Sequence, residues 1–405
     1  MDARTIKRWM DDVAFERGRT AVPVGFPALP DIPGGRYWEP EFFALEREVL
    51  FKRGWVYVGH TDQLPEPGSF IVWRRTGTPI LVIRGTDGQI RAFYNTCRHR
   101  GAPVVQQEEG KTGHFFSCGY HGWTYDTTGA LTAVTDPRDW AHLDQSCRHL
   151  VSVRCDLLGN WIYVCEDADA PSLDHFLEPI ARYFRHLPLR DLRLVHRRSV
   201  EVRGNYKVVL ENFLEAYHFR LLHRHTTDRI FDNLGTSVHL WEHGHSMMLS
   251  PNRRPDWVDP GTIGMPEMAA ATIIERDHNP SYLVFPNMIV PIAPTGIPAV
   301  AFWPQSVDRT ILDVIWFAPD WGDGECHPLW ETRIANFDRI VDEDIAFVEP
   351  IQESITSPGF RGVPLNYQER RIYHWHAELD RRIGAERVPE HLRVPPVLED
   401  WVERD

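Results

Sequence analysis

Two short segments of the chain pair a cysteine with a histidine. Cys97 and His99 are separated by one residue in CRHRG, and Cys118 and His121 by two residues in CGYHGW. Thiolates and imidazoles together suit zinc or an iron–sulfur cluster, whereas magnesium and similar ions prefer oxygen ligands. The two pairs therefore predict a four-ligand metal site built from two neighbouring turns.

The mixed composition of each pair bears on the choice between zinc and iron. Zinc sites usually group like ligands in C-x(2–4)-C and H-x(3–5)-H spacings, but here each pair holds one Cys and one His. In a Rieske 2Fe-2S centre two Cys bind one iron and two His bind the other, so each loop would supply one ligand to each iron. The spacing favours the Rieske centre, with structural zinc as the alternative.

A second group of candidate ligands lies in the segment NYKVVLENFLEAYHFRLLH. It contains Glu215, His218 and His223. His218 and His223 would be about 140° apart on a continuous helix, which is poor geometry for one metal, so we expect the helix to be distorted or to end near His223. Glu215 and His218 share a helix face, and a hydrogen bond from the imidazole to the carboxylate is feasible.

Two imidazoles need a carboxylate to complete the facial triad of a non-haem Fe(II) oxygenase. In the predicted helix that contains FDRIVDEDIAFVEPIQ, Asp344 falls near the centre of the apolar stripe, Asp342 almost opposite and Glu343 about 100° away. An acid within a buried stripe costs several kcal/mol unless it is paired or metal-bound. Asp344 is the predicted third ligand; a salt bridge to an arginine and a later helix start are the alternatives.

The elements around these residues predict an α+β chain in three parts. Short apolar runs with glycine turns at 86–88 and 127–129 predict an all-β module between Trp55 and Cys165. Beyond it the periodicity predicts a larger domain, an antiparallel sheet with packed helices. The predicted helices are 172–186, 205–222 and 327–355, and the predicted strands 281–293 and 299–318. The expected domains are an N-terminal helix and packed proline-rich arm (1–45), a cluster-binding domain (46–166) and a catalytic domain (167–405).

Composition excludes several classes of protein. The 405 residues include 44 Lys and Arg against 57 Asp and Glu, a net charge of −13 that disfavours a nucleic-acid surface. The sequence lacks a signal-peptide core and an apolar run of about 18 residues, so we expect a cytoplasmic protein without membrane association. Six cysteines are too few for a disulfide scaffold of this length.

Both motifs resemble those of one enzyme family. The segments CRHRG and CGYHGWTYDTTG resemble the Rieske fingerprint of the ring-hydroxylating, or Rieske-type, non-haem iron oxygenases. NYKVVLENFLEAYHFRLLH is similar to the N-W-K, E-N-F and D/E-x-Y-H-x4-H signature of their catalytic domain, and the resemblance spans roughly residues 50–355. It implies a terminal oxygenase alpha subunit whose catalytic domain has a helix-grip, START-like fold. In that family the first motif binds the cluster and the second binds a mononuclear Fe(II).

The resemblance also implies an electron path and an assembly. Electrons from NAD(P)H would arrive through a separate reductase, with or without a ferredoxin, since the chain has no G-x-G-x-x-G dinucleotide motif of its own. In the family an acid, here Glu215, links the second Rieske histidine of one subunit (here His121) to the first iron-ligand histidine of its neighbour (here His218). That arrangement implies a head-to-tail ring, usually a homotrimer, because the two centres of one subunit are too far apart.

Three classes of function follow as hypotheses: an oxygenase, an electron carrier and a binding module. The first is O2-dependent hydroxylation of a small organic substrate, with an aromatic compound as the family's commonest substrate. Glutamate at 215 resembles instead the branch acting on quaternary amines, so a monooxygenase or N-demethylase for a quaternary ammonium compound, held in an aromatic cage, is the alternative. A Rieske electron carrier without a catalytic iron and a zinc-stabilised binding module are alternatives of other classes.

Overall fold

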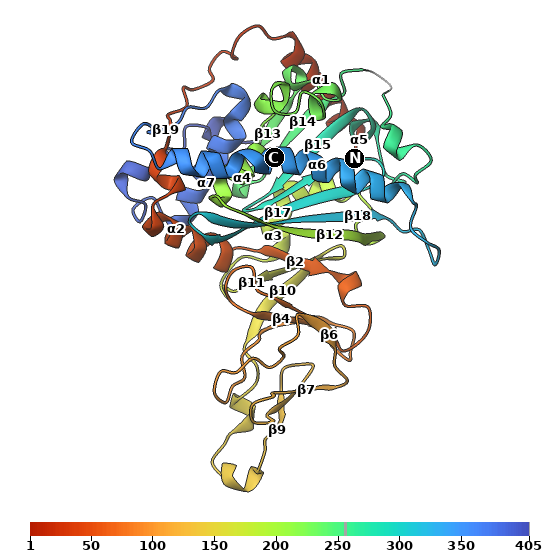
Figure 1. Ribbon diagram of the computed structural model, residues 1–405, viewed down its shortest axis with the longest axis vertical. Coiled ribbons are helices and arrows are strands. Elements are labelled where there is room, and N and C mark those ends of the chain that lie inside the picture. Colours follow the sequence, from red (N-terminus) through yellow and green to blue (C-terminus); the bar gives the residue numbers. More distant parts are fainter. Residues whose placement is uncertain (255–256, 405) are drawn as a thin grey trace. The chain divides into compact units, whose positions relative to one another are not determined.

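The computed structural model describes residues 1–254 and 257–404 and divides the chain into two compact units. The smaller unit comprises residues 51–173, and the larger unit comprises residues 1–50 together with 174–405. Figure 1 shows the helices and strands of both. The smaller unit is therefore an insertion between two segments that fold together.

The smaller unit is all-β, as the sequence predicts. Its main sheet is antiparallel, with strand order β2-β11-β10-β5-β4-β3-β6. These strands are β2 (Val56–His60), β3 (Ser69–Trp73), β4 (Ile80–Arg84), β5 (Ile90–Tyr94), β6 (Glu109–Lys111), β10 (Ser152–Leu158) and β11 (Trp161–Cys165). A second sheet contains β7 (Phe115–Ser117), β8 (Thr124–Asp126) and β9 (Leu131–Ala133). Gly88 and Gly129 turn the two predicted hairpins with positive φ angles of 81° and 86°.

The larger unit is built on a seven-stranded antiparallel sheet of order β12-β18-β17-β16-β15-β14-β13. Its strands are β12 (Leu192–Val202), β13 (Ser237–Leu240), β14 (Ser246–Pro251), β15 (His278–Val284), β16 (Met288–Pro291), β17 (Ile297–Ser306) and β18 (Arg309–Pro319). Each of the two predicted strands is in fact a hairpin: 281–293 turns at Phe285–Asn287, and 299–318 turns at Val307–Asp308. Proline and aspartate in these turns end the ladders, because proline lacks an N–H donor and aspartate bonds locally.

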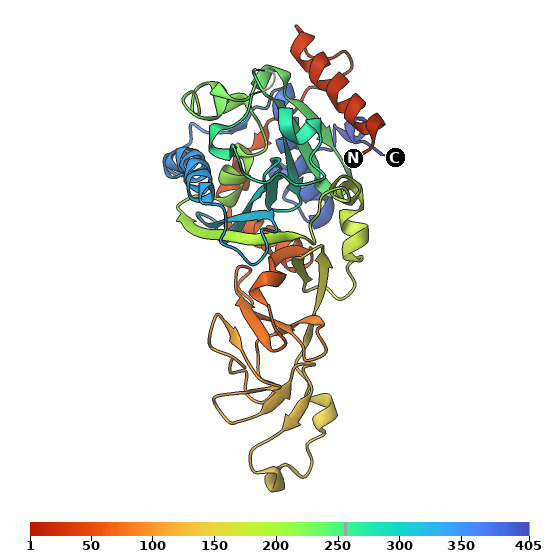
Figure 2. The ribbon, with the colours of Figure 1, turned by 90° about the vertical axis from the view of Figure 1, so that its right-hand side faces the viewer.

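Helices cover this sheet. They are α1 (Ala3–Gly18), α2 (Pro40–Glu46), α3 (Leu173–Phe184), α4 (Tyr206–Asn212), α5 (Ile273–Asp277), α6 (Leu329–Ile355) and α7 (Arg370–Ile383). Figures 1 and 2 show α6 running along one face of the sheet, and α1 packs at the edge formed by β13 and β14. The proline-rich arm pairs through β1 (Ile32–Pro33) with β19 (Gly362–Val363). No helix within 1–254 or 257–404 combines the length and apolar character needed to cross a bilayer.

The helix predicted over 205–222 is interrupted before the first histidine. It ends with α4 at Asn212, and a separate short 3-10 turn covers Tyr217–Arg220. The carboxylate of Glu215 accepts hydrogen bonds from the backbone N–H groups of Tyr217 and His218, and so caps the new turn. The break therefore comes earlier than the expected position near His223.

Candidate metal centres

The first cysteine loop connects β5 to β6. The backbone N–H of Cys97 donates to the carbonyl of Ala102 at 2.8 Å, and the carbonyl of Cys97 accepts from Gly101 N–H at 3.0 Å. Asn95 closes the base of the loop, because its side-chain oxygen accepts from the backbone N–H of Val104 at 2.9 Å. Gly101 has a φ of 77°, a conformation that costs a residue with a Cβ about 1–2 kcal/mol.

The second loop, between β7 and β8, repeats this pattern. Cys118 N–H donates to the carbonyl of Trp123 at 2.9 Å and the Cys118 carbonyl accepts from Gly122 N–H at 2.9 Å. Gly122 has a φ of 67°, and a Cβ there would lie 2.7 Å from the Thr135 hydroxyl, which itself donates to the carbonyl of His121 at 2.7 Å. Two loops of one backbone design thus present one Cys and one His each.

The two loops bring the predicted histidines next to each other and the predicted cysteines next to each other. The rings of His99 and His121 have centroids 4.5 Å apart, and the buried Cys97 and Cys118 thiols interact with one another. Burial raises the pKa of the Cys97 thiol, and the neighbouring Cys118 adds to this shift. A pair of buried thiols and a pair of imidazoles on the same two loops fit a cluster that supplies positive charge, because the thiolates would otherwise be unpaired.

Two aromatic residues that the sequence did not single out contact these ligands. The Tyr125 hydroxyl accepts from Arg98 N–H at 2.9 Å and lies 3.3 Å from Cys97 Sγ, so it is placed to donate its own proton to the sulfur when Cys97 is a thiolate. Trp123 stacks on His99 with a centroid distance of 5.0 Å and an interplanar angle of 11°. Burial and the nearby His121 lower the pKa of His99, which favours the neutral imidazole required of a ligand.

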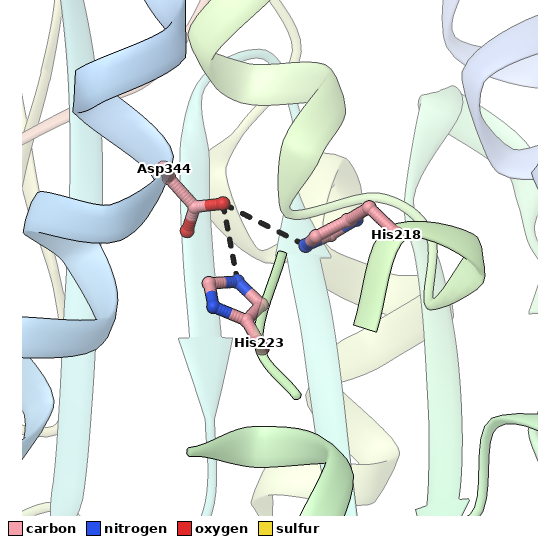
Figure 3. A group of neighbouring side chains, drawn as sticks. All are labelled: His218, His223 and Asp344. Atoms are coloured by element: carbon pink, nitrogen blue, oxygen red, sulfur yellow. Dashed lines mark ion pairs between the residues drawn. The ribbon is translucent and has the colours of Figure 1, made fainter. Parts of the chain in front are cut away.

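The second predicted site lies in the larger unit, where His218, His223 and Asp344 converge (Figure 3). Asp344 Oδ1 is 3.2 Å from His223 Nε2 and 3.6 Å from His218 Nε2, and the three ligand atoms lie within 4.8 Å of one another. The short turn after α4 supplies His218, the following loop supplies His223, and α6 supplies Asp344. The broken helix allows two histidines five residues apart to face the same point.

A carboxylate holds the outer nitrogen of each imidazole. His218 Nδ1 donates to Glu215, and His223 Nδ1 donates to Glu343 Oε2 at 2.6 Å. Each Nε2 therefore turns its lone pair toward Asp344, whose buried Oδ1 has no hydrogen-bond partner among the described residues. Three electron-rich atoms facing one another need a cation between them, so the donor set fits a divalent iron.

Glu343 is a contact that helical projection did not reveal. Its carboxylate accepts from His223 and from the Thr226 hydroxyl at 2.7 Å. Burial lowers the pKa of His223, but the nearby carboxylates of Asp344 and Glu343 outweigh this effect and leave that pKa raised. Burial likewise raises the pKa of Glu343, and the bonds from His223 and Thr226 reverse this shift. The site is thus strongly electronegative before any cation binds.

Asp344 and Asp342 on α6 point as the helical projection predicts. Asp344 is 3 % exposed, whereas Asp342 lies on the surface and accepts from Arg198 at 2.7 Å. Within residues 1–254 and 257–404, no arginine pairs with Asp344. The described residues therefore do not support the alternative of a salt bridge between Asp344 and an arginine.

A cavity of about 1270 Å³ opens beside the three converging side chains. His218, His223 and Asp344 form part of its wall, and Pro291–Pro294 and Pro298 form another part. Aromatic side chains supply much of the remaining surface: Phe213, Phe219, Phe231, Trp257, Trp316 and Phe337. The volume exceeds the roughly 300–1,000 Å³ usual for small-molecule sites.

Comparison with known proteins assigns both units. Residues 54–152 match the model of the Rieske 2Fe-2S domain, and residues 189–385 match that of the ring hydroxylating alpha subunit (catalytic domain). The glycine betaine monooxygenase oxygenase subunit of Pseudomonas aeruginosa is 24 % identical over 373 residues, which cover 82 % of this chain and 84 % of the relative.

Two solved structures share the fold of the chain. The quaternary ammonium Rieske monooxygenase CntA in complex with L-carnitine has a TM-score of 0.74 at 21 % identity and covers 90 % of this chain and 99 % of its own. Naphthalene 1,2-dioxygenase from Rhodococcus sp. bound to indole has a TM-score of 0.72 at 22 % identity, covering 95 % and 99 %.

These matches confirm the predicted α+β fold and the resemblance drawn from the two motifs. A Rieske domain joined to this catalytic domain implies a Rieske 2Fe-2S cluster and a mononuclear iron as cofactors. Proteins of this type are oxidoreductases that use O2, take electrons from a reductase or ferredoxin and act on a small substrate. The chain belongs to the Rieske-type non-haem iron oxygenases, as the alpha subunit of a terminal oxygenase.

Proposed function

We propose that this oxygenase hydroxylates a C–H bond or ring carbon of an organic molecule bound in the cavity beside His218, His223 and Asp344. These three side chains would hold the mononuclear iron. Cys97, His99, Cys118 and His121 would hold the cluster. Bound there, the iron supplies the activation of O2, and the protein supplies the position of the substrate.

One observation carries this proposal: the convergence of two imidazole nitrogens and one carboxylate oxygen on the wall of a 1270 Å³ cavity. A two-His, one-carboxylate set occupies one side of an iron and leaves positions open for O2 and substrate. An electron carrier needs neither the open positions nor the cavity. Glu215 and Glu343 fix both imidazole rings, so the ligand atoms are oriented before the metal binds.

Glu215 is proposed as the link to a neighbouring subunit. One of its carboxylate oxygens holds His218 Nδ1 and the other accepts from the backbone of Tyr217. The Tyr217 and Leu221 side chains that flank His218 are 63 % and 84 % exposed, an apolar surface that suits a subunit contact. Inter-subunit electron transfer has been described for a quaternary ammonium Rieske monooxygenase of the same fold. We therefore propose a head-to-tail homotrimer in which Glu215 meets the partner subunit's His121.

Two substrate classes fit the aromatic cavity. An aromatic ring would stack on side chains such as Phe213 and Phe219. A quaternary ammonium group would be held over the same ring faces. The second class, with monooxygenation or N-demethylation as the reaction, is favoured by the glycine betaine and carnitine monooxygenases among the relatives, the former matched over 82 % of this chain.

The test is the replacement His218→Ala in the full-length protein. The variant should keep the absorption and EPR signals of a His-ligated 2Fe-2S cluster and about two irons per chain, and should lose the third iron and all product formation with a surrogate reductase. His391→Ala, which alters an exposed histidine paired with Glu39, is the matched control. Retained turnover in His218→Ala would contradict the proposal, and a colourless zinc protein would contradict the cluster assignment.

A further inference from the structure

Helix α6 carries an arginine on the same face as Asp344. Arg333 precedes Asp344 by eleven residues, about three helical turns, so the two side chains project in nearly the same direction from points about 16 Å apart along the axis. Asn336, Phe337 and Ile340 lie between them and also line the cavity. One face of α6 thus forms a wall with the metal site at one end and a guanidinium at the other.

The guanidinium of Arg333 is buried with its hydrogen-bonding capacity unused. Its side chain is only 10 % exposed, it makes no hydrogen bond to any residue of 1–254 or 257–404, and its buried Nε is without a partner. The nearest charge is Asp259 Oδ2, 3.6 Å from Nη1, which is beyond hydrogen-bond distance. Asp259 itself lies at the cavity rim with a side chain 39 % exposed.

Two tryptophans fix the position of this guanidinium. The ring centres of Trp316 and Trp330 lie 5.3 Å and 5.9 Å from its central carbon. Such ring contacts engage the face of the planar group and leave its N–H edge free. Burial lowers the pKa of Arg333 to about 10, partly offset by Asp259, so the group remains charged at neutral pH.

A buried cation with five unused donors is costly unless a ligand completes it. A carboxylate is the anion that matches this edge, because its two oxygens accept two parallel N–H bonds from one guanidinium. A doubly charged phosphate or sulfate would be repelled by Asp259 more strongly than a singly charged carboxylate. A cationic group is disfavoured at this end of the cavity. It would bind instead to the aromatic side chains nearer the metal site.

We propose that Arg333 binds a carboxylate of the substrate, and that the carbon to be oxidised lies at the opposite end of the cavity, near Asp344. The inference rests on the proposed function and narrows it: among both aromatic and quaternary ammonium compounds, it selects those that bear a carboxylate. Arg333 is then a specificity residue that contacts the substrate and sets which end faces the metal.

The test is a calorimetric titration of the protein carrying cluster and iron, under anaerobic conditions without reductant. The probes are the phenyl carboxylates from benzoate to 5-phenylpentanoate and 4-(trimethylammonio)butanoate, each against its primary amide. At least one carboxylate should bind about tenfold or more tightly than its amide, and Arg333→Gln should bring that ratio close to one without weakening the amide. Arg309→Gln, which removes an exposed arginine paired with Glu201, should leave the ratio unchanged.

Two further measurements separate binding from a structural role. Asp259→Asn removes a competing carboxylate and should tighten carboxylate binding severalfold; unchanged or weaker binding counts against the inference. Arg333→Gln also removes a buried cation whose one ion pair, with the partly exposed Asp259, is 3.6 Å long, so the thermal midpoint of the unliganded protein should stay level or rise. A marked fall in that midpoint would assign Arg333 to structure and overturn the inference, as would equal binding of every carboxylate and amide or a failure of all carboxylates to bind.

Failure of this inference is distinguishable from failure of the proposed function. The binding assay needs no turnover, and in the His218→Ala background the carboxylate preference should survive although oxygenation is lost. A protein that prefers carboxylates but never consumes O2 would refute the oxygenase proposal and leave the Arg333 site standing. A protein that hydroxylates amides and carboxylates equally would refute the Arg333 site alone.

Discussion

The two metal centres are constructed in opposite ways. The four proposed cluster ligands lie between residues 97 and 121, on two loops that their own backbone hydrogen bonds close. The three proposed ligands of the mononuclear site span residues 218 to 344 and come from the turn and loop after α4 and from the distant helix α6. The first site is a local property of the chain, whereas the second exists only in the assembled fold.

The imidazoles of the two sites also have different neighbours. His99 lies against Trp123 and His121 and has no carboxylate among its described contacts. Burial is the largest of the effects that lower its pKa. His218 and His223 each donate to a glutamate. Neutral histidine ligands raise the potential of a Rieske cluster, and carboxylate-bound histidines are stronger donors to a metal. The first arrangement suits an electron acceptor and the second suits firm retention of Fe(II).

The largest effect that would test this contrast is the loss of Asp344. Asp344→Ala should abolish the third iron and lower product formation by at least about a thousandfold, because one of three ligands and the only negative one is removed. The Rieske EPR signal should be unchanged, since its ligands are local. Asp342→Ala, an exposed acid two residues away, is the control. An altered cluster signal in Asp344→Ala would contradict the independence of the two sites.

A smaller effect is expected from Glu343. Glu343→Gln keeps the shape of the side chain but weakens its hold on His223 Nδ1, so iron affinity should fall about 10- to 100-fold. Competition with an iron chelator measures this. Glu349→Gln on the same helix, where an exposed glutamate pairs with Arg203, should bind iron normally. Equal affinity in both variants would show that backbone geometry, and not the carboxylate, orients His223.

The smallest effect concerns the cluster half of the comparison. Tyr125→Phe removes the hydroxyl beside Cys97 Sγ and should lower the midpoint potential of the cluster by about 40 mV. A hydrogen bond from this hydroxyl to the sulfur would stabilise the reduced, more negative cluster by about 1 kcal/mol more than the oxidised cluster. A redox titration followed by EPR gives the value, with Tyr94→Phe as a control elsewhere in the smaller unit. A potential that rises or stays constant would mean that the hydroxyl does not donate to sulfur.

Sequence was a good guide wherever the chemistry is local. The Cys and His spacings indicated the cluster domain, and the glycine turns placed its hairpins, since both depend on contacts within a few residues. Helical projection separated Asp344 from Asp342 correctly because α6 is continuous from Leu329 to Ile355. The same projection places Arg333 on the helix face that carries Asp344, so the shared face of these two residues is predictable from the sequence.

Contacts between residues far apart in the chain could not be predicted from the sequence. The apolar periodicity of 205–222 predicts one helix, but Glu215 bonds to the backbone of Tyr217 and His218 and ends the regular pattern. Glu343 accepts a hydrogen bond from His223, which is 120 residues away in the sequence. Neither residue spacing nor composition predicts such a pair. The apolar runs 281–293 and 299–318 each predict one strand, because a continuous apolar run does not show where the chain turns, but each forms a hairpin.

The insertion of residues 51–173 between the two segments of the larger unit governs the order in which the protein can form during synthesis. The smaller unit is complete once residue 173 has emerged from the ribosome, so it is ready to receive its cluster first. The segment 1–50 must wait, because α1 packs on β13 and β14, which are made much later. Closing that long loop is slow, and the mononuclear site, which needs residue 344, is assembled last.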